Sequence, residues 1–326
     1  MKNIAIVTGA SSGLGREFVK HLINNKNLDE IFVLARSEDK LNELKSEYGN
    51  KIRPYPTDLS DINNIKAFGK YLEKEDINIK LLVNNAGFAK FCSYDDISID
   101  ESLNMINLNI SAVVAMGLVC IPFMQKGSHI INIASQASFQ PLPYQNIYSS
   151  TKSFVKNYSR ALNVELKEKG ITVTAVCPGW IKTNLFDRGC INAKKATTKF
   201  PHIVTPDVVA KKALKDAYKG KDMSVYGLYV NMCRIMSKFL PEKSAAGLKK
   251  LKTYSSKKLL LWNIIDLFFT SCHNLLIHTS EEKLFLPCII LRLGRKIFNN
   301  KAPHCLGERL IYPIKYTHKP TQRMHT

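Results

Sequence analysis

The sequence has no Cys-x-x-Cys pair, because its eight cysteines stand far apart, at positions 92, 120, 177, 190, 233, 272, 288 and 305. Zinc sites and disulfide frameworks are usually recognised by closely spaced cysteines. The scatter argues against both, so we expect no metal site and a reducing, cytoplasmic compartment. The start of the chain also has no basic stretch followed by a long apolar one, and we expect no signal peptide.

Acidic residues are scarce: 27 Asp and Glu stand against 47 Lys and Arg, which gives a formal net charge of +20. Such an excess suits a nucleic acid, a membrane surface or an anionic ligand. The basic residues are spread along the chain and are mostly lysine, whereas proteins that read base edges favour arginine. We therefore expect no specific nucleic-acid partner.

Short apolar runs alternate with amphipathic stretches up to about residue 230. The runs are nearly continuous rather than alternating, which is typical of strands buried on both faces. They read NIAIVTG, EIFVLAR, IRPYPTD, IKLLVNNAG, HIINIAS and ITVTAVCPG. Repeated strand–helix units predict an α/β fold, a doubly wound parallel sheet of Rossmann type with about seven strands.

The end of the chain differs in composition from the part before it. We predict a catalytic and nucleotide-binding domain over residues 1–250, with a substrate loop at 184–205, and a basic extension over 251–326 that is mainly helical. Segment 259–277 has polar residues at helical spacing on an otherwise apolar stretch. It could lie at a membrane surface with the basic residues up to 301, or pack on the domain or on a partner subunit. The alternative is an extension that adds nothing to catalysis.

The first predicted strand ends in TGASSGLG, with Gly9, Gly13 and Gly15. Glycines allow a tight turn, and a helix that begins near Leu14 can direct its first N–H groups at a pyrophosphate. A plain strand-to-helix turn would have the same composition. The motif therefore needs support from the rest of the chain.

A second motif joins a serine, a tyrosine and a lysine. Ser135 follows an apolar run, Tyr148 comes thirteen residues later, and Lys152 four residues after that. A lysine-rich chain also produces Tyr-x-x-x-Lys by chance, and Tyr254 with Lys258 is a second match. That match has no serine thirteen residues before it. Alone, the tyrosine and lysine would also fit a solvated helix face.

Taken in order, TGASSGLG, NNAG, Ser135, YSSTK and PGWIKT resemble the motifs of the short-chain dehydrogenase/reductase family, over residues 1 to about 240. The resemblance implies catalytic roles for Ser135, Tyr148, Lys152 and Asn109, with Asn107 as a rival for Asn109. It also implies that the cofactor is bound by Gly9, Ser11, Ser12, Gly13, Leu14, Gly15, Asp58, Leu59, Asn85, Ala86, Gly87, Tyr148, Lys152, Pro178, Gly179, Ile181 and Thr183. For Asp58, a helix cap or turn residue is the alternative interpretation.

The chemistry explains why these residue types occur. A carbonyl that receives hydride builds negative charge on its oxygen and needs a proton donor. Tyrosine, with an ordinary pKa of about 10, is a poor donor near neutrality. Lys152 lies one helical turn from Tyr148, and its positive charge is expected to lower the tyrosine pKa. By resemblance, Lys152 also binds the nicotinamide ribose, Ser135 holds the substrate oxygen, and Asn109 supports a water relay.

The end of the second predicted strand bears on cofactor choice. NAD enzymes of this fold place an acidic residue there to bind the ribose hydroxyls. This chain has Ala35, and Arg36 follows it, so no carboxylate repels a 2′-phosphate and a guanidinium is available to bind it. We predict NADP(H), although Arg36 could also be an ordinary surface residue.

The predicted substrate loop mixes apolar residues with lysines, which suggests a substrate with an apolar body. The sequence therefore predicts an NADP(H)-dependent oxidoreductase acting on a carbonyl or secondary alcohol. The alternative is a nucleotide-binding scaffold or membrane-peripheral protein that retains the fold without catalysis. The resemblance also implies a homo-oligomer paired through two long helices. We expect a cytoplasmic protein with peripheral membrane contact as an option.

Overall fold

The structure is a computed structural model that describes residues 1–183, 185, 189 and 202–239. Most of the predicted substrate loop, the whole predicted extension 251–326 with segment 259–277, and the Tyr254/Lys258 pair lie outside the described residues.

All strands of the described chain form one parallel sheet of seven strands, in the order β3-β2-β1-β4-β5-β6-β7. Their bounds are β1 Lys2–Thr8, β2 Glu30–Ala35, β3 Ile52–Pro56, β4 Ile77–Asn84, β5 His129–Ile133, β6 Thr172–Val176 and β7 Met223–Ser224. The predicted doubly wound, Rossmann-type fold is confirmed. The sequence pattern gave no sign of β7, because a two-residue strand is too short to show a period.

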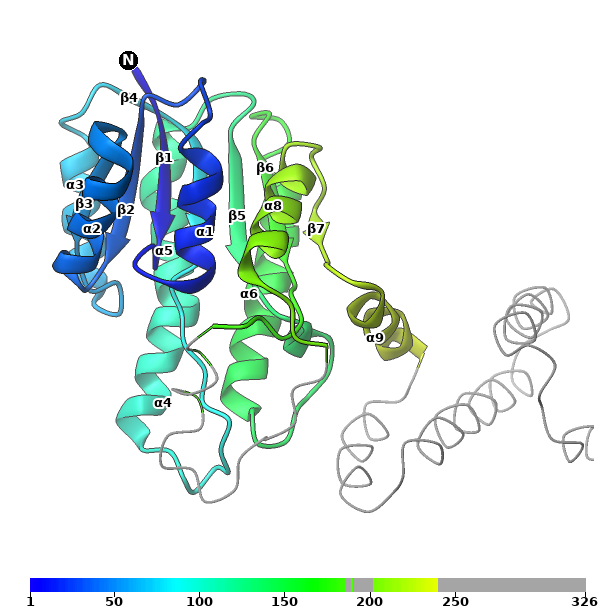
Figure 1. Cartoon of the computed structure of the whole chain (residues 1–326). Coiled ribbons are helices and arrows are strands. Elements are labelled where there is room, and N and C mark those ends of the chain that lie inside the picture. Colours follow the sequence, from blue (N-terminus) through cyan, green and yellow to red (C-terminus); the bar gives the residue numbers. More distant parts are fainter. Residues whose placement is uncertain (184, 186–188, 190–201, 240–326) are drawn as a thin grey trace, which may run out of the picture. The chain divides into compact units, whose positions relative to one another are not determined.

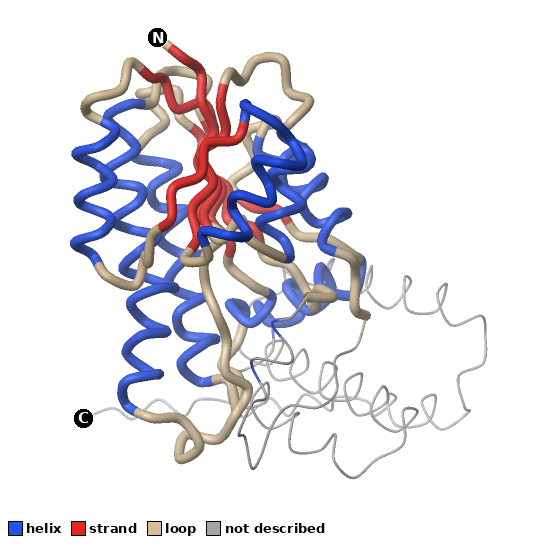
Figure 2. The backbone as a smooth tube through the Cα atoms, turned by 60° about the vertical axis from the view of Figure 1, so that its left-hand side comes forward, coloured by secondary structure: helices blue, strands red, loops and turns tan. Residues whose placement is uncertain are grey.

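Helices cover both faces of the sheet (Figures 1 and 2). The α-helices whose bounds lie within the described residues are α1 Gly13–Leu22, α2 Glu38–Tyr48, α3 Ile62–Leu72, α4 Ile99–Ile106, α5 Ala112–Cys120, α6 Asn146–Glu165, α8 Pro206–Ala217 and α9 Leu228–Phe239. Shorter turns of helix are the 3-10 segments η1 Gly49–Lys51, η3 Ile121–Phe123 and η4 Gln136–Phe139, and the π-helical segment η2 Asn107–Ser111. Helices α1, α2 and α8 pack on one face, and α3, α5 and the end of α6 on the other.

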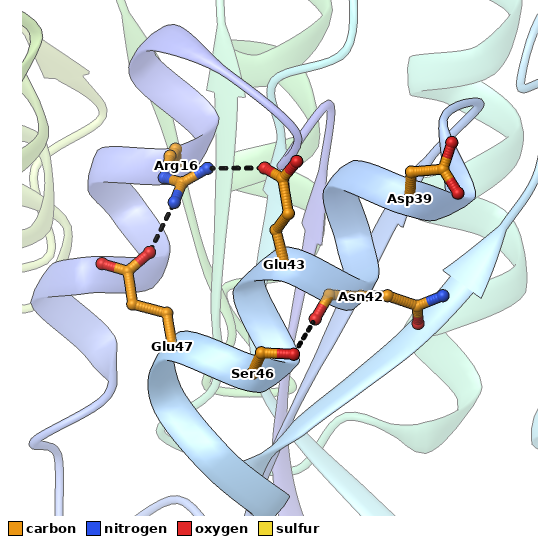
Figure 3. Close-up of a pocket in the computed structure, with 6 residues that line it drawn as sticks. All are labelled: Arg16, Asp39, Asn42, Glu43, Ser46 and Glu47. Atoms are coloured by element: carbon orange, nitrogen blue, oxygen red, sulfur yellow. Dashed lines mark hydrogen bonds and ion pairs between the residues drawn. The ribbon is translucent and has the colours of Figure 1, made fainter.

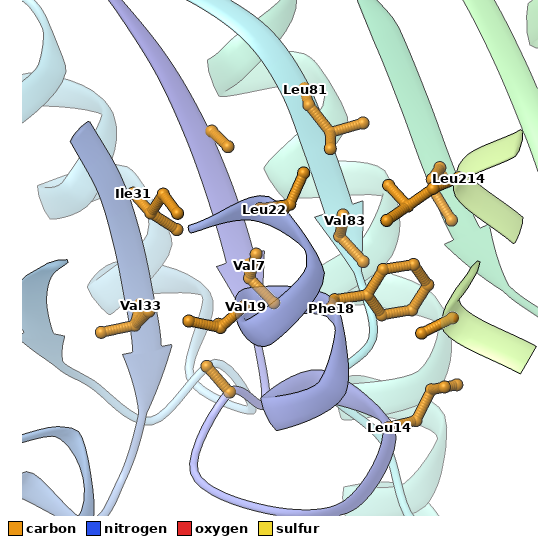
Figure 4. Close-up of a cluster of buried hydrophobic side chains, with 14 of the residues drawn as sticks. Val7, Leu14, Phe18, Val19, Leu22, Ile31, Val33, Leu81, Val83 and Leu214 are labelled. Carbon is orange, nitrogen blue, oxygen red and sulfur yellow. The ribbon is translucent and has the colours of Figure 1, made fainter. Parts of the chain in front are cut away.

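The strands are apolar throughout because both of their faces are covered. On β1, Val7 points toward α1, where it meets the fully buried ring of Phe18 and the side chain of Leu22 (Figure 4). Its neighbour Ile6 points to the opposite face and packs with α3 and α5. Burial of each such side chain stabilises the fold by about 1.5 to 3 kcal/mol. This alternation across one strand produces the continuous apolar runs of the sequence.

One helix of the described chain, Ile99–Phe123, is long and apolar enough to cross a membrane by length and composition alone. It comprises α4, η2, α5 and η3. Its inner side places Met105, Asn109 and Met116 in the core. We therefore interpret it as a core helix of the sheet layer.

Candidate active site

A cleft of about 380 Å³ opens at the carboxyl ends of the strands, beside the point between β1 and β4 where the strand order reverses. Ligands of open α/β sheets bind at such switch points. Apart from Gly15, which is buried beside the glycine turn, every residue predicted to bind the cofactor lines this cleft. These lining residues are Gly9, Ser11, Ser12, Gly13, Leu14, Arg36, Asp58, Leu59, Asn85, Ala86, Gly87, Tyr148, Lys152, Pro178, Gly179, Ile181 and Thr183.

The glycine turn depends on the absence of side chains. Gly9 and Gly13 have φ angles of 63° and 54°, a left-handed conformation that glycine adopts without strain. A Cβ on Gly15 would lie 2.2 Å from the Gly9 carbonyl oxygen, so alanine has no room there. Helix α1 begins at Gly13, and the N–H groups of its first turn have no partner within the helix. They are free to bind an anion in the cleft.

Asn85 holds this turn in place. Its side-chain Nδ2 donates to the carbonyl oxygens of Thr8 at 3.0 Å and Gly9 at 3.2 Å. The hydroxyl of Thr8 in turn accepts the backbone N–H groups of Asn85 and Ala86, each at 2.9 Å. The amide of Asn85 is thus used to position the turn, a role that its place after β4 did not reveal in the sequence.

Asn109 is fully buried, whereas its rival Asn107 is exposed. The Asn109 side chain accepts the N–H of Phe88 at 3.1 Å and donates to the Phe88 carbonyl at 3.0 Å. It also donates to the hydroxyl of Thr151 at 3.1 Å. Asn109 therefore ties the segment after β4 to α6, and it does so from η2, a π-helical turn of a kind that is frequent at functional sites.

Ser135, Tyr148 and Lys152 come together at one end of the cleft, each less than 10% exposed, at 7%, 9% and 5%. Ser135 follows β5 and caps η4, and its hydroxyl accepts the N–H of Ala137 at 3.1 Å. Tyr148 and Lys152 lie one turn apart on α6, with the Lys152 Nζ 5.8 Å from the centroid of the tyrosine ring. The same Nζ donates to the Ile133 carbonyl oxygen at 2.8 Å.

Burial dominates the acidity of both groups. It raises the pKa of Tyr148 above its ordinary value, and the Ser135 hydroxyl lowers that pKa by a smaller amount. It lowers the pKa of Lys152 to about 8. The expected lowering of the Tyr148 pKa by Lys152 is thus not seen in this arrangement. The Lys152 ammonium donates to the Ile133 carbonyl, and burial, which removes water from around the phenol, has the largest effect on the Tyr148 pKa.

The opposite end of the cleft is exposed and basic. Arg36 follows β2, Ser37 precedes the first residue of α2, and Lys40 lies in the first turn of that helix. Ser37 and Lys40 were missed in the sequence, although Lys40 stands four residues after Arg36. Asp58 is the one acidic side chain among the described residues of the cleft. Its Oδ1 accepts the N–H and the hydroxyl of Ser60, which supports the turn interpretation.

An aromatic wall next to Tyr148 was also missed. Phe91 is fully buried and packs edge-to-face against Tyr148 at 6.0 Å and against Trp180 at 5.7 Å between ring centroids. Leu142 and Leu185 line the same part of the cleft. The signal was present in the sequence, since Phe91 and Trp180 both follow predicted strands, but nothing there showed that they meet.

A second depression, of about 690 Å³, lies on the surface between α1 and α2 (Figure 3). Arg16 of α1 lines one side of it and is paired with Glu43 and Glu47 of α2. The charges of these side chains are paired with one another, and none of the side chains is buried. We interpret the depression as an ion-pair contact between two helices.

Comparison with known proteins gives consistent matches. The family model for short chain dehydrogenases matches residues 3–190. The NADPH-dependent 1-acyldihydroxyacetone phosphate reductase of Saccharomyces cerevisiae is 28% identical over 263 residues, which cover 74% of this chain and 87% of the yeast protein. The very-long-chain 3-oxoacyl-CoA reductase-B of Danio rerio is 30% identical over 249 residues, covering 73% of this chain and 76% of that protein. The closed form of a serine dehydrogenase with NADP+ is 27% identical and superimposes with a TM-score of 0.60, covering 68% of this chain and 94% of that one.

Proposed function

Because this chain belongs to the short-chain dehydrogenase/reductase family of oxidoreductases, we propose that it transfers hydride between NADP(H) and a carbonyl or secondary alcohol. One observation carries the proposal. Ser135, Tyr148 and Lys152 lie buried at one end of a cleft whose other end holds the glycine turn and a basic, exposed rim. A proton donor and a dinucleotide-binding turn thus share one continuous site.

The residues of the cleft fit a phosphorylated dinucleotide. The first turn of α1 offers N–H groups for the pyrophosphate. Arg36, Ser37 and Lys40 suit a 2′-phosphate, because a guanidinium, a hydroxyl and an ammonium can all donate to its oxygens. Two proteins similar to this chain carry NADPH or NADP+ in their names, which supports the same choice. When bound, the cofactor supplies the hydride or accepts it.

Tyr148 acts as the general acid in reduction and the general base in oxidation. Its raised pKa keeps it protonated near neutrality, so it is ready to donate to a carbonyl oxygen. Ser135, which lines the same cleft, offers its hydroxyl to the same substrate oxygen. Lys152 binds ribose hydroxyls beside the reacting centre, and Asn109 fixes the segment that carries Gly87 against α6.

The substrate class that the site supports is a carbonyl or alcohol with an apolar body. Phe91, Trp180, Leu142 and Leu185 surround the space next to Tyr148, and apolar walls favour an aliphatic or aromatic group over a charged one. The similar yeast and zebrafish proteins are named for an acylated ketone phosphate and for long-chain 3-oxoacyl-CoA. Acylated ketones are therefore the first substrates to test.

The test is consumption of NADPH by the purified full-length chain with a panel of ketones and aldehydes, acylated ketones included. We expect turnover of at least one apolar ketone, with NADPH used in preference to NADH. The alternative of a nucleotide-binding scaffold predicts tight NADPH binding in calorimetry and no turnover with any member of the panel. That result would overturn the proposed catalysis.

We also propose that the chain forms a homo-oligomer through α4, α5 and α6. Ile99, Leu103 and Leu118 are 77%, 53% and 64% exposed along the first two helices, and Phe154 and Val164 are 43% and 70% exposed on α6. Large apolar side chains gathered on neighbouring helices mark an interaction surface. Leu103→Lys should convert the oligomer to a monomer in sedimentation measurements, and a wild-type monomer at micromolar concentration would contradict this.

The predicted boundary near residue 250 and the membrane contact through 259–301 remain proposals, supported by composition alone. A chain that ends between Leu251 and Ser256 should fold and bind NADP(H). The full-length chain should bind anionic vesicles at low salt and leave them at high salt, because charge attraction to lipid headgroups is screened. If the shortened chain binds the vesicles equally well, the membrane contact lies elsewhere, whereas failure of that chain to fold would move the boundary.

A further inference from the structure

Two donors from α6 converge on one backbone carbonyl near the catalytic serine. The Nζ of Lys156 donates to the Ser138 carbonyl oxygen at 2.8 Å, and the Ser153 hydroxyl donates to the same oxygen at 3.2 Å. The Lys156 ammonium also lies 5.7 Å from the centroid of the Phe139 ring. A surface lysine normally keeps its ammonium in water. Here the side chain is partly buried, and burial lowers its pKa.

The carbonyl that Lys156 holds belongs to the same turn as Ser135. The Ser138 hydroxyl donates to the Ser135 carbonyl oxygen at 2.6 Å, and the Ser138 N–H donates to that oxygen at 3.0 Å. The hydroxyl of Ser135 accepts the N–H of Ala137 at 3.1 Å. The orientation of the Ser135 hydroxyl is therefore set by the backbone of η4.

Lys152 and Lys156 are four residues apart and share a face of α6. Lys152 holds the Ile133 carbonyl, before Ser135, and Lys156 holds the Ser138 carbonyl, after it. The two ammonium groups thus fasten both sides of the segment that carries the serine to the helix that carries Tyr148. Hydrogen bonds from charged donors are stronger than neutral ones, so this attachment is stiff.

We propose that Lys156 is a positioning residue that fixes the Ser135 hydroxyl relative to Tyr148 by holding η4 against α6. Its kinetic consequence rests on the proposed function, whereas its effect on the backbone does not. Within the described part of the chain, Lys156 contacts Ser138 and Phe139, which do not line the cleft, and it does not contact Tyr148. Its removal should therefore affect the use of Ser135 and leave cofactor binding unchanged.

The kinetic test compares Lys156→Met with Arg160→Met, which removes the same charge one turn further along α6. Lys156→Met should lower kcat about tenfold or more, since small displacements of a catalytic group are costly, with the Kd for NADPH unchanged. Lys156→Arg should recover most of the loss, and Arg160→Met should match the wild type. In a Ser135→Ala background, Lys156→Met should cause no further loss. Equal losses in both backgrounds, or an unchanged kcat, would overturn the inference.

A second measurement needs no substrate. Amide hydrogen exchange of the η4 backbone should become about tenfold faster in Lys156→Met, because loss of the donor lets the turn open, and should stay unchanged in Arg160→Met. Unchanged exchange in Lys156→Met would contradict the role in positioning. If the wild type reduces no carbonyl at all, the proposed function fails on its own, while the exchange result still decides the role of Lys156.

Discussion

The two ends of the cleft differ in how far their side chains are exposed to water. At the end proposed for catalysis, Ser135, Tyr148 and Lys152 are at most 9% exposed, and loss of water moves the pKa of both the tyrosine and the lysine. At the end proposed to bind the 2′-phosphate, Arg36 precedes α2 and Lys40 lies in its first turn, and both side chains are exposed. Buried polar groups interact strongly and are not screened, whereas exposed charges are weakened by water and salt. Catalysis and cofactor choice should therefore be separable by mutation.

The largest effect is expected at the buried end. Tyr148→Phe keeps the ring that packs on Phe91 but removes the phenolic proton, so kcat should fall by about 10² to 10⁴-fold. The Kd for NADPH should stay within about twofold, because the tyrosine contributes little to phosphate binding. Steady-state kinetics and calorimetry give both values. If the variant keeps a tenth of the wild-type kcat, Tyr148 is not the general acid/base.

A smaller effect is expected at the exposed end. Ala35→Asp combined with Arg36→Ala places a carboxylate where a 2′-phosphate would lie and removes the guanidinium. The preference between NADPH and NADH should reverse, with NADPH affinity lower by about ten- to a hundredfold. Lys45→Ala, on the same helix but outside the cleft, is the control and should change neither affinity. Native protein that binds NADH more tightly than NADPH would refute the assignment.

The buried charge of Lys152 should lower the free energy of unfolding of the protein. In the folded chain the pKa of this lysine is lowered from 10.5 to about 8, so the unfolded chain binds more protons between these values and stability rises with pH across that window. Below about pH 8 the full cost of the buried charge is present. Lys152→Met should therefore raise the free energy of unfolding at pH 7 by about 1 to 3 kcal/mol, since a lost hydrogen bond offsets part of the gain.

Denaturant unfolding of wild type and Lys152→Met at several pH values measures this difference. The gain should shrink as the pH rises from about 8 toward 10.5, because the wild-type lysine then loses its charge. Lys169→Met, at an exposed site, should show no such trend. If Lys152→Met is less stable than the wild type by the same amount at every pH, the buried charge of Lys152 does not destabilise the fold as expected.

The smallest effect is the response to salt. Raising the ionic strength to about 0.5 M should weaken NADPH binding to the wild type by a few-fold. The added ions screen the attraction between the exposed basic side chains and the phosphate groups of the cofactor. The same change should leave kcat at saturating cofactor nearly constant, since the catalytic groups are buried. Arg36→Ala should show a flatter salt dependence. Equal salt sensitivity of kcat and Kd would remove the contrast between the two ends.

The fold could be predicted because it depends on local patterns, and most of the candidate site because its motifs, taken in order, resemble those of a known family. Continuous apolar runs predicted the parallel strands, and the glycine turn, Asn85 and Ser135 follow the ends of those strands, where the sheet brings them together. Tyr148 and Lys152 reach the same cleft from α6. The placement of Asn109 in the core and Asn107 at the surface also agrees with the favoured assignment.

What could not be predicted depends on contacts between distant segments. Phe91 and Trp180 form one wall only because the loops after β4 and β6 meet, and neither loop carries a periodic signal. The bonds of Asn85 to the glycine turn and of Lys156 to η4 are also tertiary. The direction of the Tyr148 pKa could not be read from spacing, because a helical i, i+4 pair does not reveal how much water the fold removes.

The most direct test of the division between the two ends is one paired measurement. The kcat for an apolar ketone and the Kd for NADPH are determined for wild type, Tyr148→Phe and Arg36→Ala under the same conditions. We expect Tyr148→Phe to lose kcat alone and Arg36→Ala to lose NADPH affinity alone, by about tenfold. If each variant changes both quantities to a similar extent, the buried and exposed ends do not divide catalysis from cofactor choice.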